Sequence, residues 1–196
     1  MLTGDTRNFS FWYDVTERHS HFQYGPFNIF VNSKLLLAEV EDNFTLNLIA
    51  ADLSRSLKKI EHLDEVASTF NSIDLFERAM HTNGYPTASD PVFPEQWWEQ
   101  KSGKIAELID LYIEIETERK ADKPFGAELS MYSEISDKGW RFFLLGCGER
   151  EILLASKDQG KTVSSYMLPK GEVKRAIEQF LEVFSYVDDP LKKIGR

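Results

Sequence analysis

The last third of the chain carries the pattern that most restricts the fold. Four short segments rich in apolar and β-branched residues follow one another there, and turns that contain glycine separate them. Turns of this composition favour tight reversals between antiparallel strands. The segments predicted as strands are Ala127–Ile135, Trp140–Leu145, Glu151–Ser156 and Thr162–Leu168.

A helical pattern follows these four segments. Proline often opens a helix, and Pro169 stands at this point of the chain. The apolar residues after it fall on one stripe, which is typical of a helix laid across a sheet. They are Val173, Ala176, Ile177, Phe180, Leu181 and Phe184. The C-terminal third is therefore predicted to be a meander covered by a helix.

The first third predicts a smaller antiparallel unit followed by helices. Aromatic and β-branched residues indicate three strands, over Asn8–Glu17, Phe27–Val31 and Lys34–Ala38, with Asn32-Ser33 as a hairpin turn between the last two. Helical spacing then predicts one helix over Leu48–Ile60 and another that begins at Asn71 or Ser72 and runs to Met80.

The middle of the chain is less regular. Residues 83–94 hold three of the seven prolines and predict an irregular loop, and a short helix is expected around Trp97. From Ile109 onward, apolar and polar or acidic residues alternate strictly, which favours a strand, although helical spacing also fits the start of this stretch. Strands in runs, without regular βαβ alternation, indicate one α+β domain over 1–196 with a largely antiparallel sheet.

Charge is distributed unevenly along the chain. The net charge is −9, and residues 61–125 hold fourteen acids and six bases, so this segment alone contributes −8. Nucleic acids and anionic membranes are bound by basic patches, so neither is expected as a partner. A basic protein partner fits this surplus, because complementary fields speed encounter. A solvated face that keeps the protein soluble is the alternative.

The alternating stretch is the candidate binding surface. On a strand, Asp110, Glu114, Glu116 and Glu118 would form one row of carboxylates, which repel one another unless cations lie opposite. Cross-strand lysine or arginine partners are the structural alternative to a docking surface. Trp97 and Trp98 can add aromatic anchoring, because tryptophan is enriched in binding hot spots. The complete predicted contact set is Trp97, Trp98, Glu99, Asp110, Tyr112, Glu114, Glu116 and Glu118.

The possible phosphate-binding, zinc-binding and catalytic motifs lack the neighbouring residues or elements that their mechanisms need. Residues 155–162 match a relaxed phosphate-loop expression, but a strand pattern follows instead of a helix, so a hairpin turn is expected. His19 and His21 have no further ligand pair for zinc. Cys147 stands between two glycines, with no histidine nearby in sequence. We therefore expect no catalytic, cofactor-binding or metal-binding residue.

Cysteine usage and the N-terminus bear on the compartment. A single cysteine excludes a disulfide within the chain. The opening residues Met1–Asp5 form neither a basic nor an apolar leader. We therefore expect a cytoplasmic protein that is a monomer or a weak dimer.

Several stretches resemble a known family. Met1–Asp5 (MLTGD), Phe9–Asp14 (FSFWYD) and Gly25–Asn32 (GPFNIFVN), which leads into Leu35-Leu36, are similar to the bacterial immunity-protein family numbered 42. The ending of that family resembles Leu153–Thr162 (LLASKDQGKT) and Leu168–Val173 (LPKGEV). The resemblance covers about half of the chain, and it lies in aromatic and turn patterns.

The resemblance implies a cytoplasmic antidote encoded beside a polymorphic or contact-dependent growth inhibition toxin. Such a protein binds the C-terminal domain of its cognate toxin and blocks it, and an acidic inhibitor suits a basic toxin such as a nuclease. Two alternatives remain from the residues alone. One is a small cytoplasmic hydrolase whose site assembles Cys147, His19 and Asp14 in space, and the other is a non-catalytic scaffold subunit.

Overall fold

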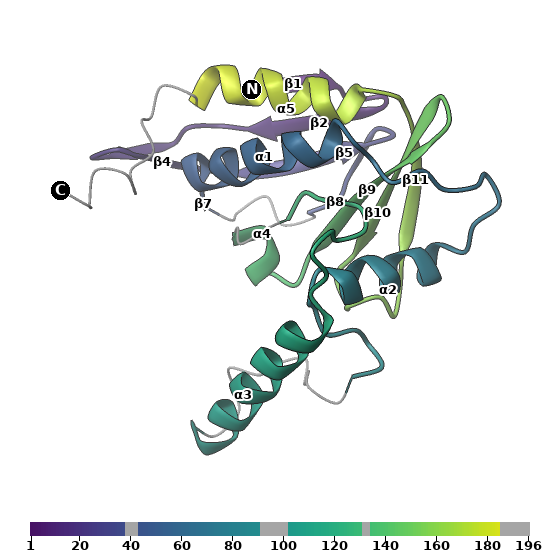
Figure 1. Cartoon of the computed structure of the whole chain (residues 1–196). Coiled ribbons are helices and arrows are strands. Elements are labelled where there is room, and N and C mark those ends of the chain that lie inside the picture. The colour runs from purple at the N-terminus through teal and green to yellow at the C-terminus, as the bar shows by residue number, and fades with distance from the viewer. Residues whose placement is uncertain (38–42, 91–101, 131–133, 185–196) are drawn as a thin grey trace.

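The predicted α+β class is confirmed by the computed structural model, which describes residues 1–37, 43–90, 102–130 and 134–184. These ranges form three antiparallel sheets and five helices (Figure 1). The first sheet orders β1 (Leu2–Asp5), β2 (Phe9–Tyr13), β5 (Phe27–Val31) and β6 (Lys34–Leu35). The second orders β11 (Ser164–Pro169), β10 (Arg150–Ser156), β9 (Arg141–Cys147) and β8 (Ala127–Glu128). The third orders β3 (Glu17–His19), β4 (Phe22–Gly25) and β7 (Phe44–Thr45).

Two helices, α1 (Leu46–Ile60) and α5 (Glu172–Phe184), run beside each other (Figure 1). Helix α5 packs on β1 and β2 of the first sheet, and α1 packs against β4 and β7 of the third sheet. The remaining helices are α2 (Ser72–Thr82), α3 (Ser102–Arg119) and α4 (Glu134–Asp137).

An aromatic cluster joins α5 to the first sheet. The ring of Phe180 lies 5.0 Å from that of Tyr13 and 5.6 Å from those of Phe11 and Phe27, measured between centroids. Alternate residues of a strand share a face, so β2 presents Phe9, Phe11 and Tyr13 to the helices. Phe180 therefore stands at the centre of this layer.

The second sheet is buried on both faces. Phe142 and Leu144 of β9 pack into the core that contains the first sheet, whereas Phe143 and Leu145 face the other way. On that second side they meet Phe76 of α2. A strand with two buried faces needs apolar residues on both, which explains the uninterrupted apolar runs Phe142–Leu145 in β9 and Ile152–Ala155 in β10.

The hairpin between β5 and β6 is confirmed, and an unpredicted bulge lies nearby. Asn32 and Ser33 adopt φ of 50° and 64°, the left-handed conformation that a two-residue hairpin needs. The ladder of β2 and β5 continues into β3 and β4 with a shift of one residue, because Asp14–Thr16 face only Gly25 and Pro26. A Cβ at Gly25 would lie 1.8 Å from the carbonyl oxygen of Asp14, so glycine is required there.

Most predicted elements are present, with shifted ends. The predicted strand Phe27–Val31 coincides with β5, and the predicted helix from Asn71 or Ser72 is α2, whose N-terminus Asn71 caps by accepting a hydrogen bond from Ile73 N. The helix expected from Pro169 begins at Glu172 instead. Pro169 is the last residue of β11 and pairs with Arg150.

Two strand predictions were wrong in whole or in part. Residues from Ile109 to Arg119 belong to helix α3, and the strand predicted over Ala127–Ile135 ends at Glu128. In α3, Ile115 is buried while Ile113 is 54% exposed, which alternation along a half-buried strand does not allow. The helical spacing at the start of this stretch therefore extends through all of it. The helix expected around Trp97 lies outside the described residues.

A buried polar network joins α1, β8 and the loop after α2. Glu128 accepts hydrogen bonds from Tyr85 Oη (3.0 Å) and Ser130 Oγ (3.3 Å), and its carbonyl accepts one from Ser56 Oγ of α1 (2.6 Å). Asp52 of α1 is also buried, with Arg55 at 2.7 Å. Burial raises the pKa of Asp52 to about 6, and the charge of Glu128 acts in the same direction, whereas Arg55 lowers it.

The aromatic cluster gives the first prediction. Phe180→Ala removes a ring that touches both β2 and β5, and it should lower the free energy of unfolding by about 3–5 kcal/mol. Urea denaturation followed by circular dichroism measures this. Val183→Ala, on the exposed side of the same helix, serves as the control and should change stability by less than about 1 kcal/mol. Equal losses in the two variants would refute the role given to Phe180.

Asp52 gives the second prediction. Its pKa is higher in the folded than in the unfolded chain, so between pH 3.8 and about 6 the unfolded chain binds fewer protons. The contribution of Asp52 to stability therefore falls as pH rises through this window. Urea denaturation across these pH values should show a shallower fall in the free energy of unfolding for Asp52→Asn than for the unsubstituted chain. Glu17→Gln, at an exposed carboxylate, should keep the original slope. An unchanged slope in Asp52→Asn would contradict the prediction.

Candidate functional site

Helix α3 extends away from the rest of the described fold (Figure 1). In the described part of the chain it packs extensively against no other helix or strand. Its C-terminal end lies near the end of α2, where Ala121 N donates a hydrogen bond to Thr82 O (3.0 Å). The acidic middle of the sequence is thus carried on a projecting helix.

The helical register places four carboxylates on one stripe of α3. Residues three or four apart on a helix are neighbours, and the members of this stripe are exposed. Among the described residues, none of them forms an ion pair within 4 Å. The acidic stripe consists of Glu107, Asp110, Glu114 and Glu118.

Two of the predicted contact residues lie off the acidic stripe. Glu116 is on the opposite side of the helix, where it pairs with Lys120 at 2.9 Å. Tyr112 is half-buried and shares a face with buried Ile115. The single row predicted from alternation is therefore wrong for Glu116, because a period of 3.6 residues separates positions that a period of two aligns.

The remaining predicted contacts cannot be placed. Trp97, Trp98 and Glu99 lie outside the described residues. The exposed side of α3 also carries apolar side chains that the sequence reasoning did not single out. Ile109 is 46% exposed and Ile113 is 54% exposed, so α3 offers apolar area as well as charge.

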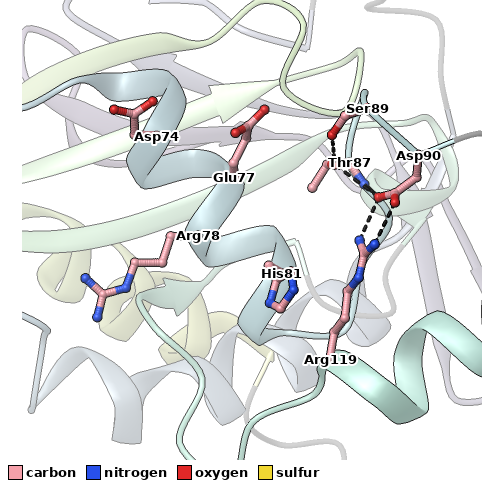
Figure 2. Close-up of a pocket in the computed structure, with 8 residues that line it drawn as sticks. All are labelled: Asp74, Glu77, Arg78, His81, Thr87, Ser89, Asp90 and Arg119. Carbon is pink, nitrogen blue, oxygen red and sulfur yellow. Dashed lines mark hydrogen bonds and ion pairs between the residues drawn. The ribbon is translucent and has the colours of Figure 1, made fainter.

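A hollow of about 450 Å³ lies between α2 and the C-terminal end of α3. Figure 2 shows its lining, in which Arg119 reaches across to Asp90 while Glu77 and His81 stand on α2. Two hydrogen bonds of 2.6 Å join the guanidinium of Arg119 to the carboxylate of Asp90. The other arginine, Arg78, lies with its guanidinium 4.0 Å from the ring centroid of Phe125. Both cations in this hollow are therefore already held by the fold.

The Asp90–Arg119 pair was missed by sequence reasoning. The Arg119 guanidinium holds the pKa of Asp90 well below its usual range, and hydrogen bonds from Thr87 act in the same direction, while burial opposes them. The pair is therefore ionised near neutral pH. Its partners lie 29 residues apart, and no local pattern in the sequence connects them.

The structure does not bring together the residues of the alternative hydrolase site. Cys147 ends β9 in the second sheet and packs beside the core under α2, whereas His19 ends β3 in the third sheet. Asp14 lies at the bulge after β2. Within the described ranges, no group of three His, Cys, Asp or Glu side chains is arranged to hold a metal ion. The loop at residues 157–163 connects β10 to β11, which pair antiparallel, so the phosphate-loop match is a hairpin, as predicted.

No helix in the described ranges is both long and apolar enough to cross a bilayer. This finding agrees with the absence of a long apolar run in the sequence.

Comparisons with known proteins address the whole chain. Residues 1–183 match the family model described as Immunity protein 42. The crystal structure of CdiI from Burkholderia dolosa AUO158 is similar in fold, with a TM-score of 0.62 and 20% identity over 93% of this chain and 99% of that chain. A search of curated proteins gave no match. Because the family match spans nearly the full length, the resemblance seen in the sequence is confirmed, and the chain belongs to the Immunity protein 42 family.

Proposed function

We propose that this immunity protein binds the C-terminal domain of a cognate toxin in the cytoplasm and inhibits it by occlusion, with α3 as the main contact. The observation that carries the proposal is the family match over residues 1–183. The fold shared with CdiI, a contact-dependent growth inhibition immunity protein, supports a toxin that belongs to a contact-dependent growth inhibition system. The proposed complex contains one copy of each protein.

The charge of α3 supports a basic toxin. Nucleases hold phosphate groups with lysine and arginine side chains, so their active-site grooves attract an acidic helix. A helix laid into such a groove is a common mode of recognition. The acidic stripe would supply the charge, and Ile113, which lies three residues from Asp110 and borders the stripe, the apolar contact. A nuclease is therefore the toxin type that we propose.

The acidic stripe contains pairs of like charges that repel one another. Asp110 and Glu114 are four residues apart, as are Glu114 and Glu118. Each such pair of like charges destabilises a helix by about 0.2–0.5 kcal/mol. Among the described residues no cation offsets them within 4 Å, whereas a basic partner would. Relief of this repulsion on binding supports the stripe as part of the contact.

The aromatic part of the contact remains a proposal. Trp97, Trp98 and Glu99 precede α3 by a few residues, and tryptophan is enriched in the central hot spots of interfaces. We include these three residues in the contact because they are close in sequence to the start of the helix.

The direct test uses the product of the adjacent upstream open reading frame. Its C-terminal domain should bind this chain saturably and with one-to-one stoichiometry in titration calorimetry. Expression of this chain should restore growth to cells that produce that domain. An unrelated toxin domain serves as the control for specificity. Absence of saturable binding to the cognate domain would reject the proposal.

The role of the acidic stripe gives a further prediction. Asp110→Lys with Glu114→Lys should slow association with the toxin domain about tenfold or more and should flatten its dependence on salt. Stopped-flow mixing over a range of ionic strengths measures both. Stability should hold or rise, because the introduced lysines face Glu107 and Glu118.

The matched control changes the same charge elsewhere. Glu17→Lys with Glu149→Lys alters the net charge by the same amount at exposed carboxylates of two hairpins. This control should slow association much less, because a local patch and not the total charge is proposed to guide docking. Equal slowing in the two double variants would move the interface away from α3.

A further inference from the structure

The direction of α3 depends on its C-terminal end. Its 18 residues span about 26 Å from first to last Cα at a rise of 1.5 Å per residue. A tilt of about 10° at Arg119 would therefore move the far end by about 4–5 Å and Asp110 by about 2 Å. Displacements of this size exceed the tolerance of a hydrogen bond. Recognition by α3 thus requires that its C-terminal end, called its base below, be held firmly.

The Asp90–Arg119 pair is placed to hold that base. Arg119 is the last residue of α3, and both ends of its guanidinium reach Asp90 at 2.6 Å (Figure 2). The side chains are largely shielded, with 23% of Arg119 and 13% of Asp90 exposed. A bidentate pair fixes orientation as well as distance. Among the described residues, this is the ion pair that joins α3 to another part of the fold.

The loop that carries Asp90 is itself anchored to the second sheet. Its Oδ2 accepts hydrogen bonds from Thr87 N (2.7 Å) and Thr87 Oγ1 (3.0 Å). Ala88, which follows Thr87, donates its N–H to Gln159 O in the hairpin between β10 and β11 (3.0 Å). Tyr85, earlier in the same loop, is bonded to buried Glu128. The loop that holds α3 is therefore bonded to the second sheet, at the β10–β11 hairpin and at buried Glu128 of β8.

A close backbone contact completes the base. Gly84 has φ of 81°, and a Cβ there would lie 3.3 Å from both the Cα and the carbonyl oxygen of Glu116. This contact limits the approach of α3 to the loop, but it provides no directional bond. Directional bonds come from the Asp90–Arg119 pair at the last residue of α3 and from the hydrogen bond of Ala121 N to Thr82 O just beyond it.

We infer that Asp90 and Arg119 form a positioning pair that fixes the direction in which α3 projects and thereby sets the affinity for the toxin. Neither side chain needs to touch the toxin for this role. The inference rests on the proposed function, in which α3 is the contact. If the pair is broken, α3 samples several directions, and the apparent affinity falls in proportion to the fraction that remains competent to bind.

The first arm of the test needs no toxin. Spin labels at Glu107→Cys on α3 and Glu149→Cys on the hairpin between β9 and β10 report the direction of the helix, with Cys147→Ala as the background. The distance distribution should be narrow with the pair intact and clearly broader in Arg119→Gln and in Asp90→Asn. Arg175→Gln, which breaks the ion pair with Glu172 inside α5, is the matched control and should stay narrow.

The second arm measures affinity for the toxin domain by calorimetry. Arg119→Gln and Asp90→Asn should each weaken binding roughly tenfold if about a tenth of the molecules keep the competent direction. The double variant should be no weaker than either single one. Arg119→Gln makes the chain more negative and Asp90→Asn makes it less negative, so equal losses cannot come from the overall field. Arg119→Lys, which keeps the charge without the bidentate geometry, should lie between.

The outcomes separate the two proposals. Urea denaturation first confirms that each variant is folded. Broadened distances together with weakened binding support the positioning role. Unchanged distances, or full affinity despite broadened distances, overturn it. Failure of the unsubstituted chain to bind the toxin domain would instead reject the proposed function, and the recognition role of the pair with it.

Discussion

Burial of the second sheet on both faces is the constraint on which the rest of the structure depends. Strands β9 and β10 each contain an uninterrupted run of four apolar residues, Phe142–Leu145 and Ile152–Ala155, and so they need cover on two sides. The first sheet with α1 and α5 lies on one side, and α2 lies on the other. The chain must then cross from α2 back to β8, and α3 lies within this crossing. The segment that contains α3 leaves and returns at one place, because Ala121 N donates a hydrogen bond to Thr82 O, so the core closes without the projecting helix.

Local sequence patterns predicted the secondary structure correctly where the apolar residues fitted only one period. The stripe of α5 and the aromatic strand β5 each match a single periodicity, and both predictions are confirmed. Between Ile109 and Ile115, however, apolar residues satisfy two periods at once. Among the described residues, α3 meets distant parts of the chain at its C-terminal end, so Ile115 is buried there while Ile109 and Ile113 remain exposed, and this burial pattern distinguishes the helix from a strand. Local sequence does not contain that information.

The same limit applies to the candidate site. The acidic surplus of residues 61–125 was visible from composition, but its arrangement was not. A helix keeps Asp110 and Glu114 together and moves Glu116 to the other side, where Lys120 neutralises it. The Asp90–Arg119 pair joins a loop to a helix end across 29 residues, so only the folded chain reveals it. Trp97, Trp98 and Glu99 stay predictions.

The central claim is that α3 is the surface on which a toxin docks. Hydrogen–deuterium exchange, read by mass spectrometry on the chain with and without the cognate toxin domain, tests it most directly. If α3 is the docking surface, backbone amides of residues 107–118 exchange more slowly in the complex, with smaller changes over the first and third sheets. Unchanged exchange along α3, with protection appearing instead on another face such as the edge strand β11, would contradict it.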